Sequence, residues 1–191
     1  DRSRGFVRGY SFQVARGLSP ISSANGGLNG DRVPWGRGHR HAYDQRFDRT
    51  LTVAIIGEDL PEAHNRVDLD PKLTDTHGIP APRVIYRLSE NSRCMLAHGV
   101  ARAREVLEAA GARAVAVNPL LRAGGWHLMG TARMGTDPRR SVIDPQGRCH
   151  DVPNLYVVDG SVMPTCGGVN PTSTIQAVAL YIADGMIRRR A

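Results

Sequence analysis

The chain has 191 residues, which is long enough to bury one full domain core or parts of two domains. Its hydrophobic content of 41% and charged content of 23% are ordinary for a soluble globular protein. No run approaches the roughly 18 to 20 apolar residues that cross a bilayer, so we expect no membrane span. The net charge of +7 comes from arginines scattered along the chain, and aromatic residues make up only 5%. This argues against a nucleic-acid-binding protein, which needs a clustered basic patch with stacking aromatic side chains.

The cysteine usage predicts a cytoplasmic protein. The histidine spacing predicts that it has no metal site. The three cysteines lack CxxC spacing, which favours reduced thiols in an intracellular protein. His39, His41 and Asp44 lie in a loop-like segment with no further ligand at metal spacing. The chain begins at Asp1 without an apolar leader segment, so we expect a cut product whose true N-terminus lies elsewhere.

The first 50 residues are expected to be mainly irregular. Tyr10–Ala15 alternates in character and predicts a strand. From Gly17 to about Asp48 the sequence is rich in Gly, Ser, Asn, Pro and Arg with little periodicity. Such a segment is uncommon inside a compact domain, so we interpret it as a lid, an interdomain loop or a disordered stretch.

The middle of the chain predicts strands followed by a helix. The expected strands are Leu51–Ile56, Asn65–Asp70 and Arg83–Arg87, with a further short one at Ala114–Val117. The expected helix is Ser89–Ala110, with Ser89 as N-cap and Gly111 as C-cap. His98 is interpreted as a packing histidine of this helix.

The last third of the chain predicts a turn, a strand and a second helix. Asp144-Pro145-Gln146 is a turn with proline at its second position, and the apolar run Asn154–Asp159 predicts a buried strand. A helix opens at Pro171 or Thr172 and runs to about Arg189, with proline in the first turn and arginines at the end. Runs of strands, then a strand feeding directly into a helix, predict an α+β sheet joined to a piece of a parallel α/β domain.

His127 lies among Gly125, Gly130 and Gly135, where backbone can pass close to a ligand. Although a lone histidine is most often structural, its titration near neutral pH suits it to accept the proton that an alcohol loses on oxidation.

Asn170 and Asp159 have both structural and functional interpretations. Asn170, which follows Gly167-Gly168 at the mouth of the second helix, is either the N-cap or a donor to a substrate oxygen. The helix N-terminus itself suits a group that becomes anionic. Asp159 is either a capping residue or an acceptor for the hydroxyl groups of a ligand at the end of a strand.

Three motifs together resemble the C-terminal part of the glucose–methanol–choline (GMC) oxidoreductase family over about Trp126 to Met186. The motifs are His127-x-x-Gly130-Thr131-x-x-Met134-Gly135, Asn154-Leu155-x-Val157-Val158-Asp159-x-Ser161-Val162-x-Pro164 and Asn170-Pro171-Thr172. Less closely, residues from about Leu51 to Gly111 resemble the substrate domain of that family.

The resemblance implies FAD-dependent oxidation of a CH–OH group in a small alcohol or sugar, by an oxidase or a dehydrogenase. Hydride would pass to flavin N5, with His127 as base and Asn170 as the second member of the catalytic pair. Asp159, Gly160, Pro171 and Thr172 would contact the flavin. Met163, Pro164 and Val169 would line the approach.

The Gly-x-Gly-x-x-Gly strand–turn–helix that holds the ADP half of FAD in the family is not found in this sequence. We therefore expect a mainly antiparallel substrate-domain sheet flanked by helices, plus the final strand and helix of an incomplete FAD-binding α/β domain. The expected regions are 1–50, irregular; 51–140, substrate-binding; and 141–191, the end of the substrate domain and the returning strand and helix. Either the chain works with a missing FAD-binding domain or partner subunit, or it is a fragment that is inactive and flavin-free alone.

Overall fold

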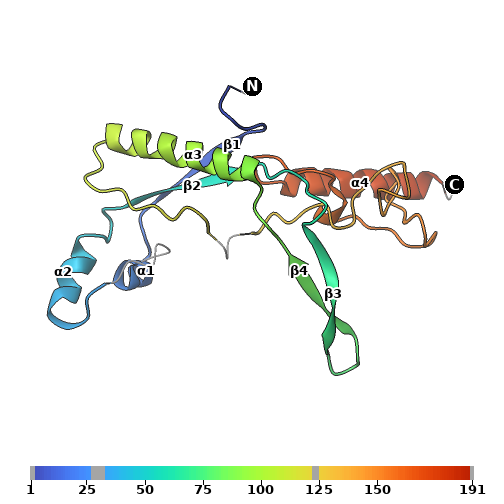
Figure 1. The fold of residues 1–191 in the computed structure, drawn as a ribbon, viewed down its shortest axis with the longest axis horizontal. Coiled ribbons are helices and arrows are strands. Elements are labelled where there is room, and N and C mark those ends of the chain that lie inside the picture. Colours follow the sequence, from blue (N-terminus) through green and yellow to red (C-terminus); the bar gives the residue numbers. More distant parts are fainter. Residues whose placement is uncertain (1–2, 27–32, 122–124, 190–191) are drawn as a thin grey trace. The chain divides into compact units, whose positions relative to one another are not determined.

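The computed structural model describes residues 3–26, 33–121 and 125–189, which form two compact units (Figure 1). Unit 1 contains residues 1–57 and 94–124, and unit 2 contains residues 58–93 and 125–191. The chain thus leaves unit 1 and returns to it. The three regions expected from sequence, 1–50, 51–140 and 141–191, stay a prediction.

Unit 1 is built on a two-stranded antiparallel hairpin. β1 (Tyr10–Arg16) pairs with β2 (Leu51–Gly57), in a register from Tyr10↔Gly57 to Arg16↔Leu51. Within its described residues, the connection expected to be irregular contains the short helices α1 (Pro20–Asn25), η2 (Gly36–Gly38) and α2 (His39–Asp44). Residues 27–32 of that connection lie outside the described part of the chain.

Helix α3 (Glu90–Ala109) packs on this hairpin, and its ends match the sequence expectation. The Ser89 hydroxyl oxygen accepts a hydrogen bond from the Ser92 backbone N–H at 3.1 Å, which caps the first turn. A Cβ on Gly99 would lie 3.1 Å from Cγ2 of Ile55, so the helix approaches the strand where it has no side chain. His98 bonds the Tyr10 hydroxyl through Nδ1 at 2.8 Å, which confirms its packing role.

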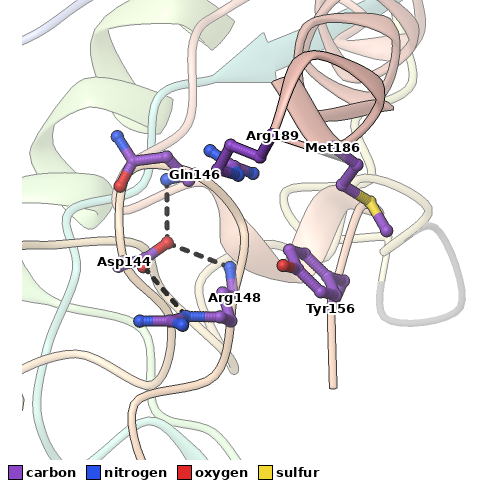
Figure 2. Close-up of a pocket in the computed structure, with 6 residues that line it drawn as sticks. All are labelled: Asp144, Gln146, Arg148, Tyr156, Met186 and Arg189. Carbon is purple, nitrogen blue, oxygen red and sulfur yellow. Dashed lines mark hydrogen bonds and ion pairs between the residues drawn. The ribbon is translucent and has the colours of Figure 1, made fainter. Parts of the chain in front are cut away.

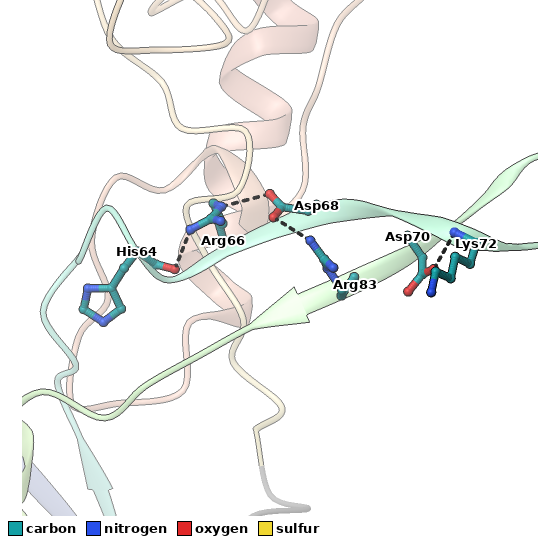
Figure 3. A network of polar contacts seen from close by, with 6 residues as sticks. All are labelled: His64, Arg66, Asp68, Asp70, Lys72 and Arg83. Atoms are coloured by element: carbon teal, nitrogen blue, oxygen red, sulfur yellow. Dashed lines mark hydrogen bonds and ion pairs between the residues drawn. The ribbon is translucent and has the colours of Figure 1, made fainter.

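Unit 2 contains a second hairpin, formed by β3 (Arg66–Thr74) and β4 (Pro80–Ile85), with a register shift between Leu69 and Thr74. Figure 3 shows the Asp68 carboxylate between Arg66 on its own strand, at 2.9 Å, and Arg83 on the opposite strand, at 3.4 Å. At the base, the Asn65 side chain accepts from the Arg87 N–H at 2.7 Å and extends the ladder. Most side chains of this hairpin are exposed.

The rest of unit 2 is mainly irregular chain that ends in α4 (Thr172–Arg188). The turn at residues 144–147 is confirmed, because the Gly147 N–H donates to the Asp144 carbonyl at 2.9 Å. The expected strand Asn154–Asp159 makes only an isolated bridge, Arg148↔Tyr156, and Ala114–Val117 forms no strand. An apolar run needs a neighbouring strand to complete a ladder, and in the described chain neither segment has one.

The antiparallel part of the predicted fold class is confirmed, because the described strands form two small antiparallel sheets flanked by helices. Among the described helices, none is long and apolar enough to cross a membrane.

Candidate active site

A small buried cluster in unit 2 supports the segments that the sequence singles out. Ile143, Cys149 and Val162 are buried and pack together. Half-buried Met134 and Val178 pack against them, and Val178 belongs to α4. The cluster therefore joins the chain after His127, the turn region and the last helix.

The chain after His127 runs along residues 160–163. The Ala132 N–H donates to the Ser161 carbonyl at 3.0 Å, and the Met134 N–H donates to the Val162 carbonyl at 2.8 Å. Gly130 has φ +84°, and a Cβ there would lie 3.2 Å from the Met163 carbonyl oxygen. The glycine is thus required both for its left-handed backbone and for the close approach. His127 itself is half-buried.

Asp159 and Gly160 lie at the meeting point of three segments. A Cβ on Gly160 would lie 3.3 Å from the Leu128 carbonyl oxygen and 3.2 Å from Cδ1 of Ile175, in the first turn of α4. The residue after His127, the end of the apolar run and the helix mouth therefore come together at a position where a side chain would crowd the backbone.

The Asp159 side chain caps the short helix η3 (Gly160–Val162), accepting from the Ser161 backbone N–H at 2.8 Å. Hydrogen bonds from the Ser161 side chain and backbone lower the pKa of the Asp159 carboxyl. The carboxylate is exposed and has further lone pairs, so the cap leaves room for it to accept another hydrogen bond.

Helix α4 begins at Thr172 with Pro171 in the N-cap position, and no side chain caps it. Asn170 therefore lies one residue before the cap, and the interpretation of Asn170 as the N-cap was wrong. Proline lacks a side-chain acceptor and occupies that place. The first N–H groups of α4 keep their partial positive charge beside Gly160.

The loop before Asn170 is held by an acidic pair that the sequence analysis missed. The Gly168 N–H donates to Oε1 of Glu58 at 3.2 Å, and Sγ of Cys166 donates to the Asp59 carbonyl at 3.1 Å. Burial raises the pKa of the Cys166 thiol. Nothing local marks Glu58 and Asp59, because their partners lie more than 100 positions away.

A cavity of about 350 Å³ lies at the other end of α4 (Figure 2). It is lined by Asp144, Gln146, Arg148, Tyr156, Met186 and Arg189. None of the sequence-predicted site residues lines this cavity. Within residues 3–26, 33–121 and 125–189, no three His, Cys, Asp or Glu side chains gather as metal ligands.

Gly160 thus contacts both Leu128, the residue after His127, and Ile175 in the first turn of α4. The GMC oxidoreductase family model matches residues 61–179, more than half of the chain, and the chain belongs to that family. Members of the family are FAD flavoproteins.

The relatives are dehydrogenases and oxidases. The chain is 44% identical over 190 residues to 2-methyl-1,2-propanediol dehydrogenase of Mycolicibacterium austroafricanum, which covers 99% of this chain and 34% of that protein. It is 42% identical to paromamine 6'-oxidase of Streptomyces fradiae over 71% of this chain and 25% of that protein. The chain thus spans about a quarter to a third of the length of these curated relatives, and it corresponds to their C-terminal portion.

A solved structure of pyridoxine 4-oxidase from Mesorbium loti has a similar fold. The TM-score is 0.51 at 20% identity, covering 70% of this chain and 29% of that chain. At this identity the likeness concerns the fold alone, and it matches the small antiparallel sheets and helices described above.

The residues present fit the flavin end of FAD better than its ADP end. The exposed Asp159 carboxylate faces no competing cation among its described contacts, and Pro171, the N-cap residue of α4, makes no side-chain hydrogen bond to the first turn. Hydroxyl groups and a group with partial negative charge are the ligands that this set accommodates.

Proposed function

We propose that this chain forms the catalytic portion of an FAD-dependent oxidoreductase that oxidises a CH–OH group in a small alcohol or sugar. The observation that carries the proposal is the meeting of Leu128, Gly160 and Ile175, because it sets the residue after His127 beside the mouth of α4. Membership of the GMC family supports the same conclusion.

In this proposal His127 is the base that takes the hydroxyl proton. A neutral imidazole carries a ring nitrogen that can accept a proton, and the half-buried position of His127 keeps it accessible to a small substrate. Two hydrogen bonds after the Gly130 turn, from Ala132 and Met134, fix the chain that follows His127 on residues 161 and 162. That support limits how far the imidazole moves during proton transfer.

Asn170 is the second member of the proposed pair. Its amide NH₂ would donate to the substrate oxygen as the hydroxyl proton leaves. The adjacent N-terminus of α4 adds N–H groups and partial positive charge, which favour negative charge developing nearby. Asn170 is exposed and belongs to the same unit as His127, and this supports the proposal that the two side chains meet one ligand.

Asp159, Gly160, Pro171 and Thr172 would hold the flavin end of the cofactor. FAD, when bound, supplies the acceptor for the hydride that leaves the CH–OH carbon. The Asp159 carboxylate would accept from cofactor hydroxyl groups, because it is exposed and has lone pairs beyond the one used by the cap. The lowered pKa of Asp159 keeps this acceptor ionised at neutral pH.

The partner proposed for this chain is an FAD-binding portion, either in the same polypeptide or as a separate subunit. Helix α4 supports this idea. The face that does not pack on the cluster exposes Leu180, Tyr181 and Ile187, and 72% of the area of Leu180 is accessible. Exposed apolar side chains on one helix face are typical of an interface. The alternative is that the chain alone is an inactive, flavin-free piece.

The central experiment replaces His127 with alanine in the complete flavoprotein. Loss of a general base is expected to lower turnover about 10²- to 10⁴-fold while FAD remains bound. 2-Methyl-1,2-propanediol is the first substrate to assay, because the dehydrogenase named for it is 44% identical to this chain. His77→Ala, in the exposed turn of the β3–β4 hairpin, is the matched control and should leave turnover unchanged. Wild-type turnover in His127→Ala would remove His127 from the reaction.

The partner proposal is tested separately, by the absorption spectrum of the purified chain. We expect no flavin band without the FAD-binding portion. A yellow preparation from the chain alone would contradict this expectation.

Leu180→Ala should weaken association of the two portions more than Asp184→Ala on the same face, because only the leucine buries apolar area.

A further inference from the structure

The loop Cys166–Gly168 is tied to one short acidic segment of unit 2. Glu58 accepts from the Gly168 N–H at 3.2 Å through its carboxylate, and Asp59 accepts from the Cys166 thiol at 3.1 Å through its carbonyl. Gly168 is buried, whereas the following Val169 and Asn170 are exposed. The two anchors therefore fix the backbone just before the exposed residues Val169 and Asn170.

The acidic segment is itself fixed by donors from two other elements. The Tyr86 hydroxyl, after β4, donates to Oδ2 of Asp59 at 2.6 Å, and the Ser92 hydroxyl, in the first turn of α3, donates to Oδ1. Desolvation and the neighbouring Asp59 carboxylate raise the pKa of the Tyr86 phenol. The phenol thus remains a donor throughout the working pH range, and both oxygens of Asp59 are engaged.

The anchors matter because Gly167-Gly168 would otherwise be the freest backbone near the site. Glycine loses more conformational freedom on folding than any other residue. Without these hydrogen bonds, the Gly167-Gly168 backbone would sample more conformations and would hold Asn170 less firmly in place. With Gly168 held by Glu58 and with Pro171 fixed as the N-cap of α4, only Val169 and Asn170 lie between two fixed points.

We infer that Glu58 and Asp59 are positioning residues that set the place of Asn170 in the active site. This inference rests on the role proposed for Asn170 above. Glu58 holds Gly168, two residues before Asn170, and Asp59, which Tyr86 and Ser92 hold, fixes the backbone next to Glu58. Neither acidic side chain is required to touch the substrate.

The test uses the complete flavoenzyme with Glu58→Ala, Glu58→Gln and the control Glu62→Ala. Glu58→Ala removes the acceptor for Gly168 and should lower kcat about 10- to 100-fold with FAD retained, since a misplacement of about 1 Å costs up to about 10²-fold. Glu58→Gln keeps an acceptor oxygen and should recover most of that loss. Glu62 lies four residues away and uses only its backbone carbonyl, so Glu62→Ala should behave as wild type. If Glu58→Ala fails to retain FAD, Glu58→Leu replaces it.

A double variant separates positioning from a general structural effect. If Glu58 acts through Asn170, then Glu58→Ala should add little to the loss already caused by Asn170→Ala. Multiplied losses in the double variant, or wild-type kcat in Glu58→Ala, would overturn the inference while leaving the proposed function intact. If Asn170→Ala and His127→Ala both turn over normally, the proposed function fails, and the positioning inference fails with it.

Discussion

Two apolar regions of unit 2 have opposite surroundings. Ile143, in the cluster below the candidate site, has 0% of its area exposed, whereas Val84, on the β3–β4 hairpin, has 68%. The cluster draws its members from the turn region, η3 and α4, so apolar atoms surround it. The hairpin has only its own two strands. The apolar cluster that supports the candidate site is therefore complete within unit 2. The hairpin, in contrast, leaves apolar side chains exposed.

Polar contacts keep the hairpin together in place of a core. Asp68 joins the two strands by pairing with Arg66 and Arg83, but both arginine side chains are about half exposed. Ion pairs that are open to solvent stabilise a fold only weakly, and a lone two-stranded hairpin is marginal in water. Stability should therefore be concentrated in the cluster.

The strongest test of this comparison is to truncate one apolar side chain in each region. Ile143→Ala should lower the free energy of unfolding by about 3 to 4 kcal/mol, because it leaves a cavity in a closed cluster. Val84→Ala should change it by about 0.5 kcal/mol or less, since the side chain is already in water. Urea unfolding followed by circular dichroism measures both, and similar losses in the two variants would contradict the comparison.

A pair of glycines with the same backbone angle gives a second test. Gly147 has φ +78° and a Cβ there would lie 2.6 Å from Cδ1 of Ile182, while Gly78 has φ +79° with nothing within 4 Å. Gly147→Ala combines backbone strain with overpacking and should cost about 3 kcal/mol. Gly78→Ala incurs the strain alone and should cost about 1 kcal/mol.

Because the backbone term is shared, the difference between the two melting temperatures isolates the packing around Ile182. Equal shifts would mean that α4 moves away from the turn without cost.

The smallest expected effects on stability come from two aspartates, one in the hairpin and one at the candidate site. Their contributions should respond differently to salt. Hydrogen bonds and charge from Arg66 and Arg83 lower the pKa of Asp68, whereas neutral donors on Ser161 lower that of Asp159. Each carboxylate therefore stabilises the fold above the unfolded pKa of about 4, and the contribution is lost as pH falls through the folded pKa.

Asp68→Asn and Asp159→Asn should each weaken the fall in stability at acid pH. At about 1 M NaCl the Asp68 effect should nearly vanish, because salt screens exposed ion pairs, while that of Asp159 should persist. Urea midpoints measured across pH at low and high salt decide this. A salt-sensitive Asp159 would indicate an ionic partner.

Sequence patterns predicted the elements whose causes are local. The caps at Ser89 and Gly111 predicted α3, and the proline and arginine placement predicted α4 within one residue at each end. The run at 154–159 misled because strand formation depends on a neighbour that the run itself does not encode. The contact of Glu58 with Gly168 joins residues 110 positions apart, and no periodicity reports such a pairing. The roles of His127 and Asn170 stay predictions that rest on motif resemblance.

Helix α4 has one further consequence. It is continuous from Thr172 to Arg188, a rod about 25 Å long, with Val178 packed on the cluster, Ile182 buried and Leu180 exposed on another face. A partner that covers the exposed face would suppress fraying along the whole rod, including the first turn that faces Gly160. The free energy of association with such a partner would then also order the reaction centre, so association would increase turnover.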